Sequence, residues 1–245
     1  GQSWEEVSPD LTRNQDQKQG KGGGPYTVEA VGAENYGTLS YIAESPHEKG
    51  VLWTGSDDGL VHLTRDGGRT WDDVTPQDLE ECLINAIEIS PHDKATAYIA
   101  TTRYKFNDKR PGIYRTTDYG QTWTRLCDGI PDNAFTRVVR EDHERPGLLV
   151  AGTETGLYLS TNGGQQWESF QLNLPVTPIL DVAIRHDDII VATSGRSFWI
   201  LDDLGLIRQV EERDTDFHLF EPEPAMLSNH SSPLNATRKD FDGTH

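Results

Sequence analysis

Three carboxylates stand in short turns bounded by glycine. Asp57 and Asp58 lie in the run SDDG, and Glu154 lies in TETG. Hydrolysis of a glycosidic bond requires two carboxyl groups about 5 to 9.5 Å apart across the sugar, so these residues are the first candidates for a catalytic acid and base. The same runs are good β-turn sequences, and solvated turn carboxylates are the second interpretation. No spacing singles out a pair, so the catalytic residues stay unknown.

A basic and aromatic set accompanies these acids. Arg103 and Tyr104 are adjacent, and Arg196 lies in the run SGRSFW. A guanidinium in such a place suits either bidentate binding of a ligand carboxylate or an ion pair with an acid of a neighbouring repeat. We take Arg103, Tyr104, Arg196 and Glu154 as the candidate ligand-binding residues.

Other common catalytic signatures are missing from the sequence. It contains no nucleophile elbow, no zinc motif, no glycine-rich phosphate loop ahead of a helix and no DxDxDG-type calcium loop. We therefore predict no metal site and no cofactor.

The elements that must position these side chains repeat along the chain. TRDGGRTW at 64–71 recurs as TTDYGQTW at 116–123 and STNGGQQW at 160–167, and a decayed copy ends in LDDLG at 201–205. The short carboxylate fixes an Asx-type turn, glycine supplies positive φ, and the tryptophan anchors the next strand. We assign these residues a structural role: Thr64, Asp66, Gly68, Trp71, Thr116, Asp118, Gly120, Trp123, Ser160, Asn162, Gly164, Trp167, Asp203 and Gly205.

Apolar strands flank each copy of the motif. A further strand precedes each unit, at residues 39–44, 85–90, 135–140 and 179–184. Four antiparallel strands in about 40 to 50 residues are the size of one propeller blade. The sequence thus predicts an all-β propeller segment over 1–210, with blades at 39–76, 84–128, 135–171 and 179–210. An outer strand at 4–8, a loop insertion at 9–37 and a C-terminal extension at 211–245 complete the assignment.

Composition limits the partners. The chain has 245 residues, a formal net charge of −18 and a pI near 4.7, which argues against nucleic acid and anionic membranes. No apolar run is long enough to insert into a membrane. Cys82 and Cys127 form either a disulfide or two separate buried thiols.

The motif resembles the BNR or Asp-box repeat. GSDDGLVHLTRDGGRTW, LNLPVTPILD and ATSGRSFWILDDL resemble the final blades of sortilin-like, "glycosyl hydrolase-like" secreted bacterial propellers, which are related to photosystem II stability and assembly factors. The resemblance implies an extracellular or periplasmic protein, Asp boxes on the outer rim, and a parent propeller larger than this chain. Ser194 stands where relatives carry histidine, which weakens any mechanism that needs an imidazole there.

The combined interpretation is a non-catalytic binding or scaffold propeller that recognises protein or glycan on its central face. The alternatives are a glycoside hydrolase with paired acids on that face and a protein-assembly factor. Four blades and a stray strand do not readily close a ring. We therefore expect either pairing with the missing blades, as another chain or copy, or closure with the strand around Trp4 as part of a fifth blade.

Overall fold

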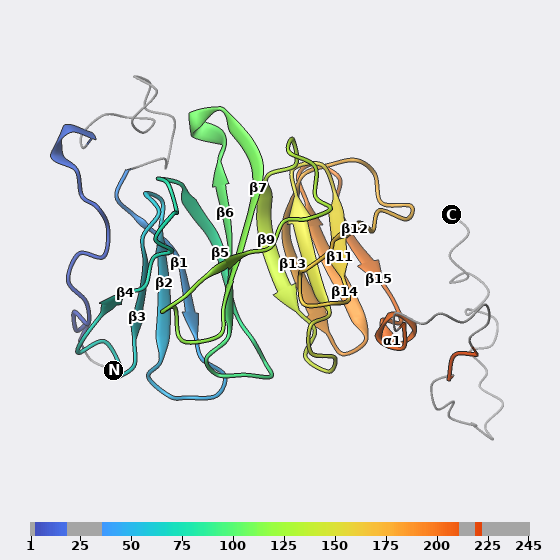
Figure 1. The fold of residues 1–245 in the computed structure, drawn as a ribbon, viewed down its shortest axis with the longest axis horizontal. Helices are drawn as coiled ribbons and strands as arrows, with labels where there is room; N and C mark the ends of the chain where they lie inside the picture. The colour runs from blue at the N-terminus through green and yellow to red at the C-terminus, as the bar shows by residue number, and fades with distance from the viewer. Residues whose placement is uncertain (1–2, 19–35, 211–218, 222–245) are drawn as a thin grey trace. The chain divides into compact units, whose positions relative to one another are not determined.

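The computed structural model describes residues 3–18, 36–210 and 219–221 (Figure 1). The chain divides into two compact units, Gly1–Glu211 and Glu212–His245. Most of the C-terminal extension at 211–245 and residues 19–35 of the insertion at 9–37 lie outside the described residues.

The described residues of the first unit form four antiparallel sheets, which we number blades 1 to 4. Each is a meander in which strands pair in chain order, so the all-β expectation is confirmed. Blade 4 has three strands where the sequence predicted four. The elements are η1 (Asp16–Lys18), β1 (Leu39–Glu44), β2 (Leu52–Ser56), β3 (Val61–Thr64), β4 (Asp72–Asp73), β5 (Leu83–Ile89), β6 (Ala97–Arg103), η2 (Tyr104–Phe106), β7 (Asp108–Thr116), β8 (Thr124–Arg125), β9 (Thr136–Glu141), β10 (Leu149–Thr153), β11 (Leu157–Ser160), β12 (Glu168–Ser169), β13 (Ile179–Arg185), β14 (Asp188–Thr193), β15 (Phe198–Leu201) and α1 (Gly205–Arg208).

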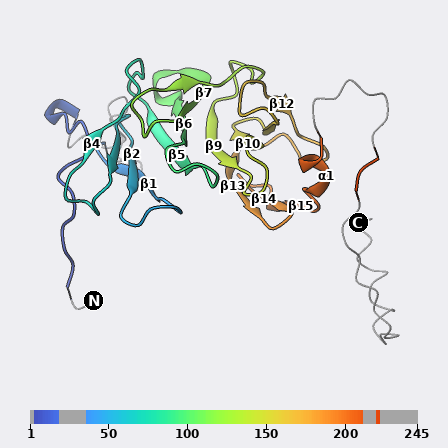
Figure 2. The same ribbon diagram turned by 60° about the horizontal axis from the view of Figure 1, so that its bottom comes forward.

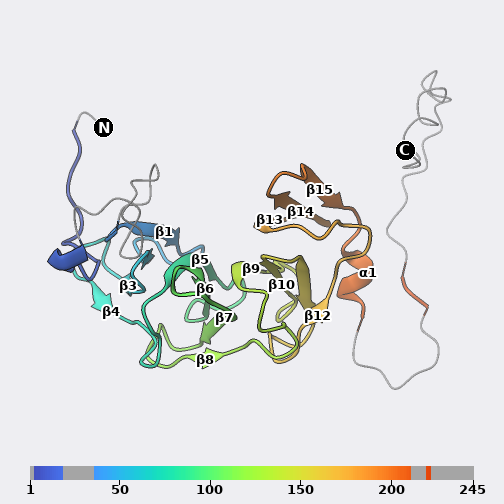
Figure 3. The ribbon, with the colours of Figure 1, turned by 90° about the horizontal axis from the view of Figure 1, so that it is seen from above.

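The blades follow one another around an arc. Figures 2 and 3 show β1, β5, β9 and β13 on the inner side of this arc, and Figure 3 shows β4, β8 and β12 on its outer side. A β-bulge interrupts the start of each inner strand, at Ser40, Asn85, Arg137 and Leu180. A bulge increases the local bend and twist, which suits strands that start close to a common axis.

Local hydrogen bonds explain the repeated turn. The Thr64 hydroxyl donates to Asp66 and accepts from the backbone N–H of Gly68, and Asp66 accepts from both the N–H and the hydroxyl of Thr70. Gly68 has φ of +93°, which favours a residue without Cβ. The boxes of blades 2 and 3 repeat this pattern around Asp118 and Asn162.

Blade 4 does not form this turn, contrary to the prediction for Asp203 and Gly205. Leu201 replaces the hydroxyl residue, so the bond from a Thr or Ser hydroxyl at this position to the Asp cannot form. The chain instead enters α1 at Gly205, and Arg208 stands where the other blades have tryptophan.

Apolar side chains fill the spaces between consecutive blades. Trp53, Val61 and Leu63 of blade 1 pack with Ile84, Ile87 and Ile99 of blade 2, and all are essentially inaccessible to solvent. A second buried cluster joins blades 2, 3 and 4. Burial of these faces against each other is the main source of stability for a fold of stacked sheets.

Two kinds of hydrogen bond recur between blades. The box tryptophans donate Nε1–H to backbone oxygens on the side of the preceding blade. Trp71 donates to Val7 at 3.0 Å, Trp123 to Val74 at 2.8 Å and Trp167 to Leu126 at 3.1 Å. His47 and His92 bond through Nε2 to backbone oxygens of Ser90 and Asp142 in the following blade, at 2.9 and 2.7 Å. A carbonyl only accepts, so Nε2 carries the proton in both histidines.

Residues 4–8 do not form the predicted outer strand. They nonetheless lie beside blade 1, where the backbone oxygen of Val7 accepts the hydrogen bond from Trp71.

Cys82 and Cys127 are separate buried thiols, and burial raises the pKa of Cys82 to about 12. Within the described residues no helix has the length and apolar character needed to cross a membrane.

Candidate functional site

The two aspartates proposed as catalytic candidates, Asp57 and Asp58, accept hydrogen bonds from backbone N–H groups, and Asp58 also accepts one from a serine hydroxyl. Asp58 is fully buried and accepts from the Ser56 hydroxyl at 2.5 Å and from the Arg13 N–H at 2.7 Å. Asp57 accepts from the N–H groups of Gly37 and Thr38, while burial raises its pKa. Both carboxylates hold chain segments in place, and Asp58 has no surface to offer a ligand.

Two of the other candidates, Glu154 and Tyr104, lie near the ring of Phe135. Glu154 accepts from Nε and Nη2 of Arg137 at 3.0 and 2.6 Å, and the Arg137 guanidinium lies 5.1 Å from the Phe135 ring. Tyr104 stacks on the same Phe135 ring at 5.9 Å. Arg103 is held by carboxylates of Glu80 and Asp108 and by the backbone oxygen of Glu81. Its guanidinium is therefore occupied by the protein itself.

Arg196 lies apart from this group. It is exposed in the turn between β14 and β15, and its backbone oxygen accepts from Trp199 Nε1 at 2.7 Å. Among the residues that the structure describes, its guanidinium forms no ion pair. The predicted residues therefore do not make one site.

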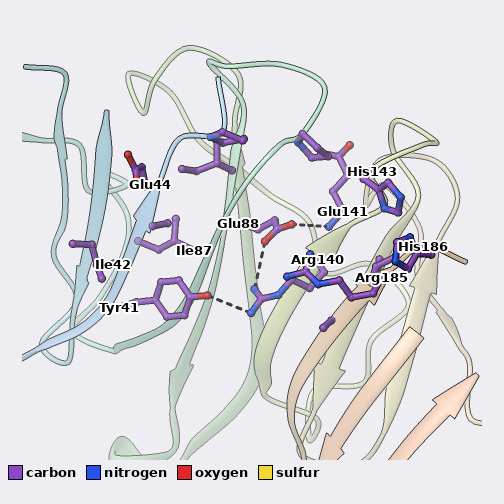
Figure 4. Close-up of a pocket in the computed structure, with 16 residues that line it drawn as sticks. Tyr41, Ile42, Glu44, Ile87, Glu88, Arg140, Glu141, His143, Arg185 and His186 are labelled. Carbon is purple, nitrogen blue, oxygen red and sulfur yellow. Dashed lines mark hydrogen bonds and ion pairs between the residues drawn. The ribbon is translucent and has the colours of Figure 1, made fainter. Parts of the chain in front are cut away.

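A cavity lies on the inner strands, which sequence reasoning did not single out. It measures about 580 Å³ and is lined by residues of β1, β5, β9 and β13 and of the turns that follow them. Figure 4 shows Glu44 on the blade 1 side and His143, His186 and Arg185 on the opposite side. We call this space the axial cavity.

Arg140 connects all four inner strands in the wall of this cavity (Figure 4). Its Nη2 donates to the Tyr41 hydroxyl of β1 at 3.3 Å and to Asp181 of β13 at 2.8 Å. Its Nε donates to the Val182 backbone oxygen at 3.0 Å, and its Nη1 lies 3.6 Å from Glu88 of β5. One side chain of blade 3 thereby bonds to blades 1, 2 and 4.

Glu88 is less well satisfied than Arg140. Its contacts are the guanidinium at 3.6 Å and the Glu141 N–H at 3.4 Å, both long for hydrogen bonds. Burial raises the pKa of Glu88 to about 7, against the opposing influence of Arg140. A carboxylate with weak partners in a cavity wall is able to accept a donor from a ligand.

A sequence signal for this pair exists in the strand register. Glu88 pairs across the sheet with Tyr98, and Arg140 pairs with Val150 in the corresponding place of the next blade. Opposite charges therefore occupy equivalent positions of adjacent inner strands. Detecting them requires the bulge positions, which the repeat spacing does not reveal.

Among the described residues, no group of three or more His, Cys, Asp or Glu side chains is arranged to bind a metal ion. No protein-family model and no curated protein sequence matches the chain.

Solved structures do match. YCF48 bound to a D1 peptide superposes with a TM-score of 0.51 at 17% identity, over 67% of this chain and 50% of that one. An ancestral GH74 enzyme matches with a TM-score of 0.53 at 16% identity, over 64% of this chain and 22% of that one. The GH74 xyloglucanase of Xanthomonas campestris matches with a TM-score of 0.53 at 14% identity, over 67% and 29%.

The four sheets are propeller blades. The chain spans half the length of YCF48 and less than a third of the GH74 enzymes. At these identities the likeness establishes the propeller fold and leaves activity open.

Proposed function

We propose that this propeller segment is a non-catalytic binding module that takes a protein segment in its axial cavity. The observation that carries the proposal is the cavity itself, with an under-satisfied carboxylate at Glu88 and basic side chains across from it. A peptide offers a cationic side chain to Glu88 and carbonyl or carboxylate oxygens to Arg185. The fold likeness to YCF48, whose structure holds a D1 peptide, is consistent with such a role.

A glycan is less well matched to this cavity. Sugar sites commonly present the faces of Trp, Tyr or Phe, and Tyr41 is the only one of these types among the described residues that line the axial cavity. Its hydroxyl is already bonded to Arg140. Hydrolysis is also poorly supported. Glu88 and Asp181 approach the same guanidinium, which leaves no open space for a sugar between them.

An assembly factor would use the same docking chemistry, and we group that alternative with protein binding. Export to the periplasm or the extracellular space also belongs to the proposal. An acidic, disulfide-free propeller is compatible with it but does not require it.

The test is a peptide array and a glycan array probed with the full chain, followed by calorimetry on hits. Glu88→Gln and Arg185→Ala should each weaken peptide binding about tenfold, the effect of one charge-assisted bond. Glu168→Gln, on the outer strand β12, is the matched control and should bind normally. Glu154→Gln and Arg196→Ala probe the turn residues that the sequence favoured. Binding lost only in those two, or turnover of any glycan, would contradict the proposal.

A further inference from the structure

The N-terminal segment copies the outer strand of a blade. Trp4 to Val7 read WEEV, matching WDDV at 71–74, WTRL at 123–126 and WESF at 167–170. In blades 1 to 3 the fourth residue of this run donates its N–H to the neighbouring strand: Val74 to Val61, Leu126 to Ile113 and Phe170 to Leu157, at 2.9, 2.8 and 2.9 Å. The backbone oxygen of the same residue accepts a hydrogen bond from the tryptophan of the following blade. Val7 already makes this second bond, because its oxygen accepts from Trp71.

Among the described residues, blade 4 has no counterpart of the strand that this segment resembles. Strand β15 pairs with β14 and forms the edge of a three-stranded sheet. The consequence is visible at one equivalent position, where Val61, Ile113 and Leu157 are 0, 0 and 4% exposed but Phe198 is 77% exposed. Ile200, two residues further on the same strand, is also exposed. An open apolar edge of this kind is a site for strand addition.

A small apolar groove lies beside that edge. Its walls include Leu157, Phe170, Leu174 and Val191, with β15 completing them. These residues of blades 3 and 4 occupy the positions that Val61, Val74, Leu79 and Ile99 occupy in blades 1 and 2, as judged from the strand register and from the place of Leu174 and Leu79 after the outer strand. Trp123 hydrogen-bonds to Val74 and packs against the cluster that contains the other three. The groove is therefore the place where a blade 4 tryptophan belongs.

Trp4 holds in the run WEEV the place that the box tryptophans hold in blades 1 to 3, and it is completely exposed. Its own chain cannot deliver it while Val7 stays bonded to Trp71. Figure 1 shows β3 and β4 at one end of the row of sheets and β15 at the other. The groove and the segment that fits it thus lie at opposite ends of one molecule.

We propose that a second copy of this chain completes blade 4. Residues 3–7 of one copy add to β15 of the other, with Glu5 opposite Ile200, Glu6 opposite Trp199, and Trp4 in the groove. Blade 1 of that copy then covers the exposed face, because Ile42 lies on the side of blade 1 turned away from Trp53 and is itself exposed. The exchange is reciprocal and closes a two-fold ring of both sets of four blades. It does not depend on the peptide-binding proposal.

The first test is the mass of the full chain by light scattering and sedimentation over a range of concentrations. The expected result is a dimer. Trp4→Ala and Phe198→Ser should each weaken association by roughly tenfold or more, since each removes a large apolar side chain from the contact. Leu180→Ser, an exposed apolar residue on the inner strand β13 at the opposite edge of blade 4, is the control. Circular dichroism checks that the variants keep their sheets, which the exposure of Trp4 and Phe198 leads us to expect.

A designed cross-link tests the register. In antiparallel pairs the Cα atoms opposite each other lie about 5.5 Å apart, within reach of a disulfide. Glu5→Cys combined with Ile200→Cys should give a covalent dimer under a mild oxidant, whereas Glu5→Cys with Glu168→Cys should not, because β12 already completes blade 3. A chain that stays monomeric at every concentration, or a disulfide formed within one chain, would overturn the proposal. So would a dimer that neither Trp4→Ala nor Phe198→Ser weakens.

Discussion

The indole Nε1 of Trp123 donates a hydrogen bond to the backbone oxygen of Val74, 2.8 Å away and one blade earlier in the chain. The same bond links Trp167 to Leu126. Each box therefore both shapes its own turn and ties its blade to the one before. This is why a turn motif that needs no tryptophan for its local geometry nevertheless carries one.

The first prediction concerns this bond. Trp167 is 1% exposed, so Trp167→Phe leaves the Leu126 oxygen buried without a donor and should destabilise the fold by roughly 1 to 3 kcal/mol. Trp71→Phe should have a smaller effect, below about 1 kcal/mol, because water reaches its exposed bond to Val7. Urea unfolding followed by circular dichroism measures both. Equal losses would contradict a role set by burial.

The second prediction concerns acid stability. Hydrogen bonds from the N–H and hydroxyl of Thr70 lower the pKa of Asp66 to about 2, and Thr122 lowers that of Asp118 in the same way. A lowered pKa gives stability that is present above the ordinary value near 4 and is lost as pH falls through the folded value.

The urea midpoint should therefore fall between about pH 4 and pH 2. Asp66→Asn should flatten part of that fall, since asparagine does not titrate and the third box already uses Asn162. Glu168→Gln is the exposed control and should leave the profile unchanged. A wild-type profile that is flat in this range would contradict the assignment.

The third prediction concerns Glu88. Burial raises its pKa to about 7, so the folded state holds a proton that the unfolded state has released. The sign is opposite to that of Asp66: the associated stability is present below about pH 4.5 and is lost as pH rises through 7. Glu88→Gln should consequently stabilise the protein at pH 8, by up to about 3 kcal/mol, and have little effect at pH 4. Thermal unfolding across this range measures the difference, and a variant that destabilises equally at both pH values would refute it.

The fourth prediction concerns the end of blade 4. Although burial opposes ionisation, hydrogen bonds from Arg208 lower the pKa of Asp142, whose side chain is fully buried. Arg208→Ala leaves that carboxylate without its guanidinium and should destabilise the fold by roughly 3 to 5 kcal/mol. Lys94→Ala breaks an exposed pair with Glu48 and should change stability far less than Arg208→Ala. Denaturant midpoints compare the two, and similar small values would argue against a structural role for Arg208.

Features held together by residues close in the sequence could be predicted, and features that depend on residues far apart in the sequence could not. The box depends on bonds that span two to four residues, as from Asp66 to Thr64 and Thr70, so its spacing predicted the strands on either side. In the sequence Asp58 resembles a solvent-exposed turn carboxylate. In the structure its carboxylate accepts a hydrogen bond from the backbone N–H of Arg13, 45 residues away. Arg140 and Tyr41 are 99 residues apart. Their contact exists because successive blades turn by a set angle about an axis, a quantity that no local pattern encodes.

The direction of the tryptophan bonds has a consequence for assembly. The box tryptophans of blades 1 to 3 all donate towards the amino-terminal side, so the row of blades is polar: Trp71 is the donor at one end and β15 is a sheet edge at the other. Head-to-tail contacts of this kind build open helical filaments unless the rotation between copies closes a ring. A variant that alters the angle between blades by a few degrees would therefore be expected to convert a finite particle into a fibre.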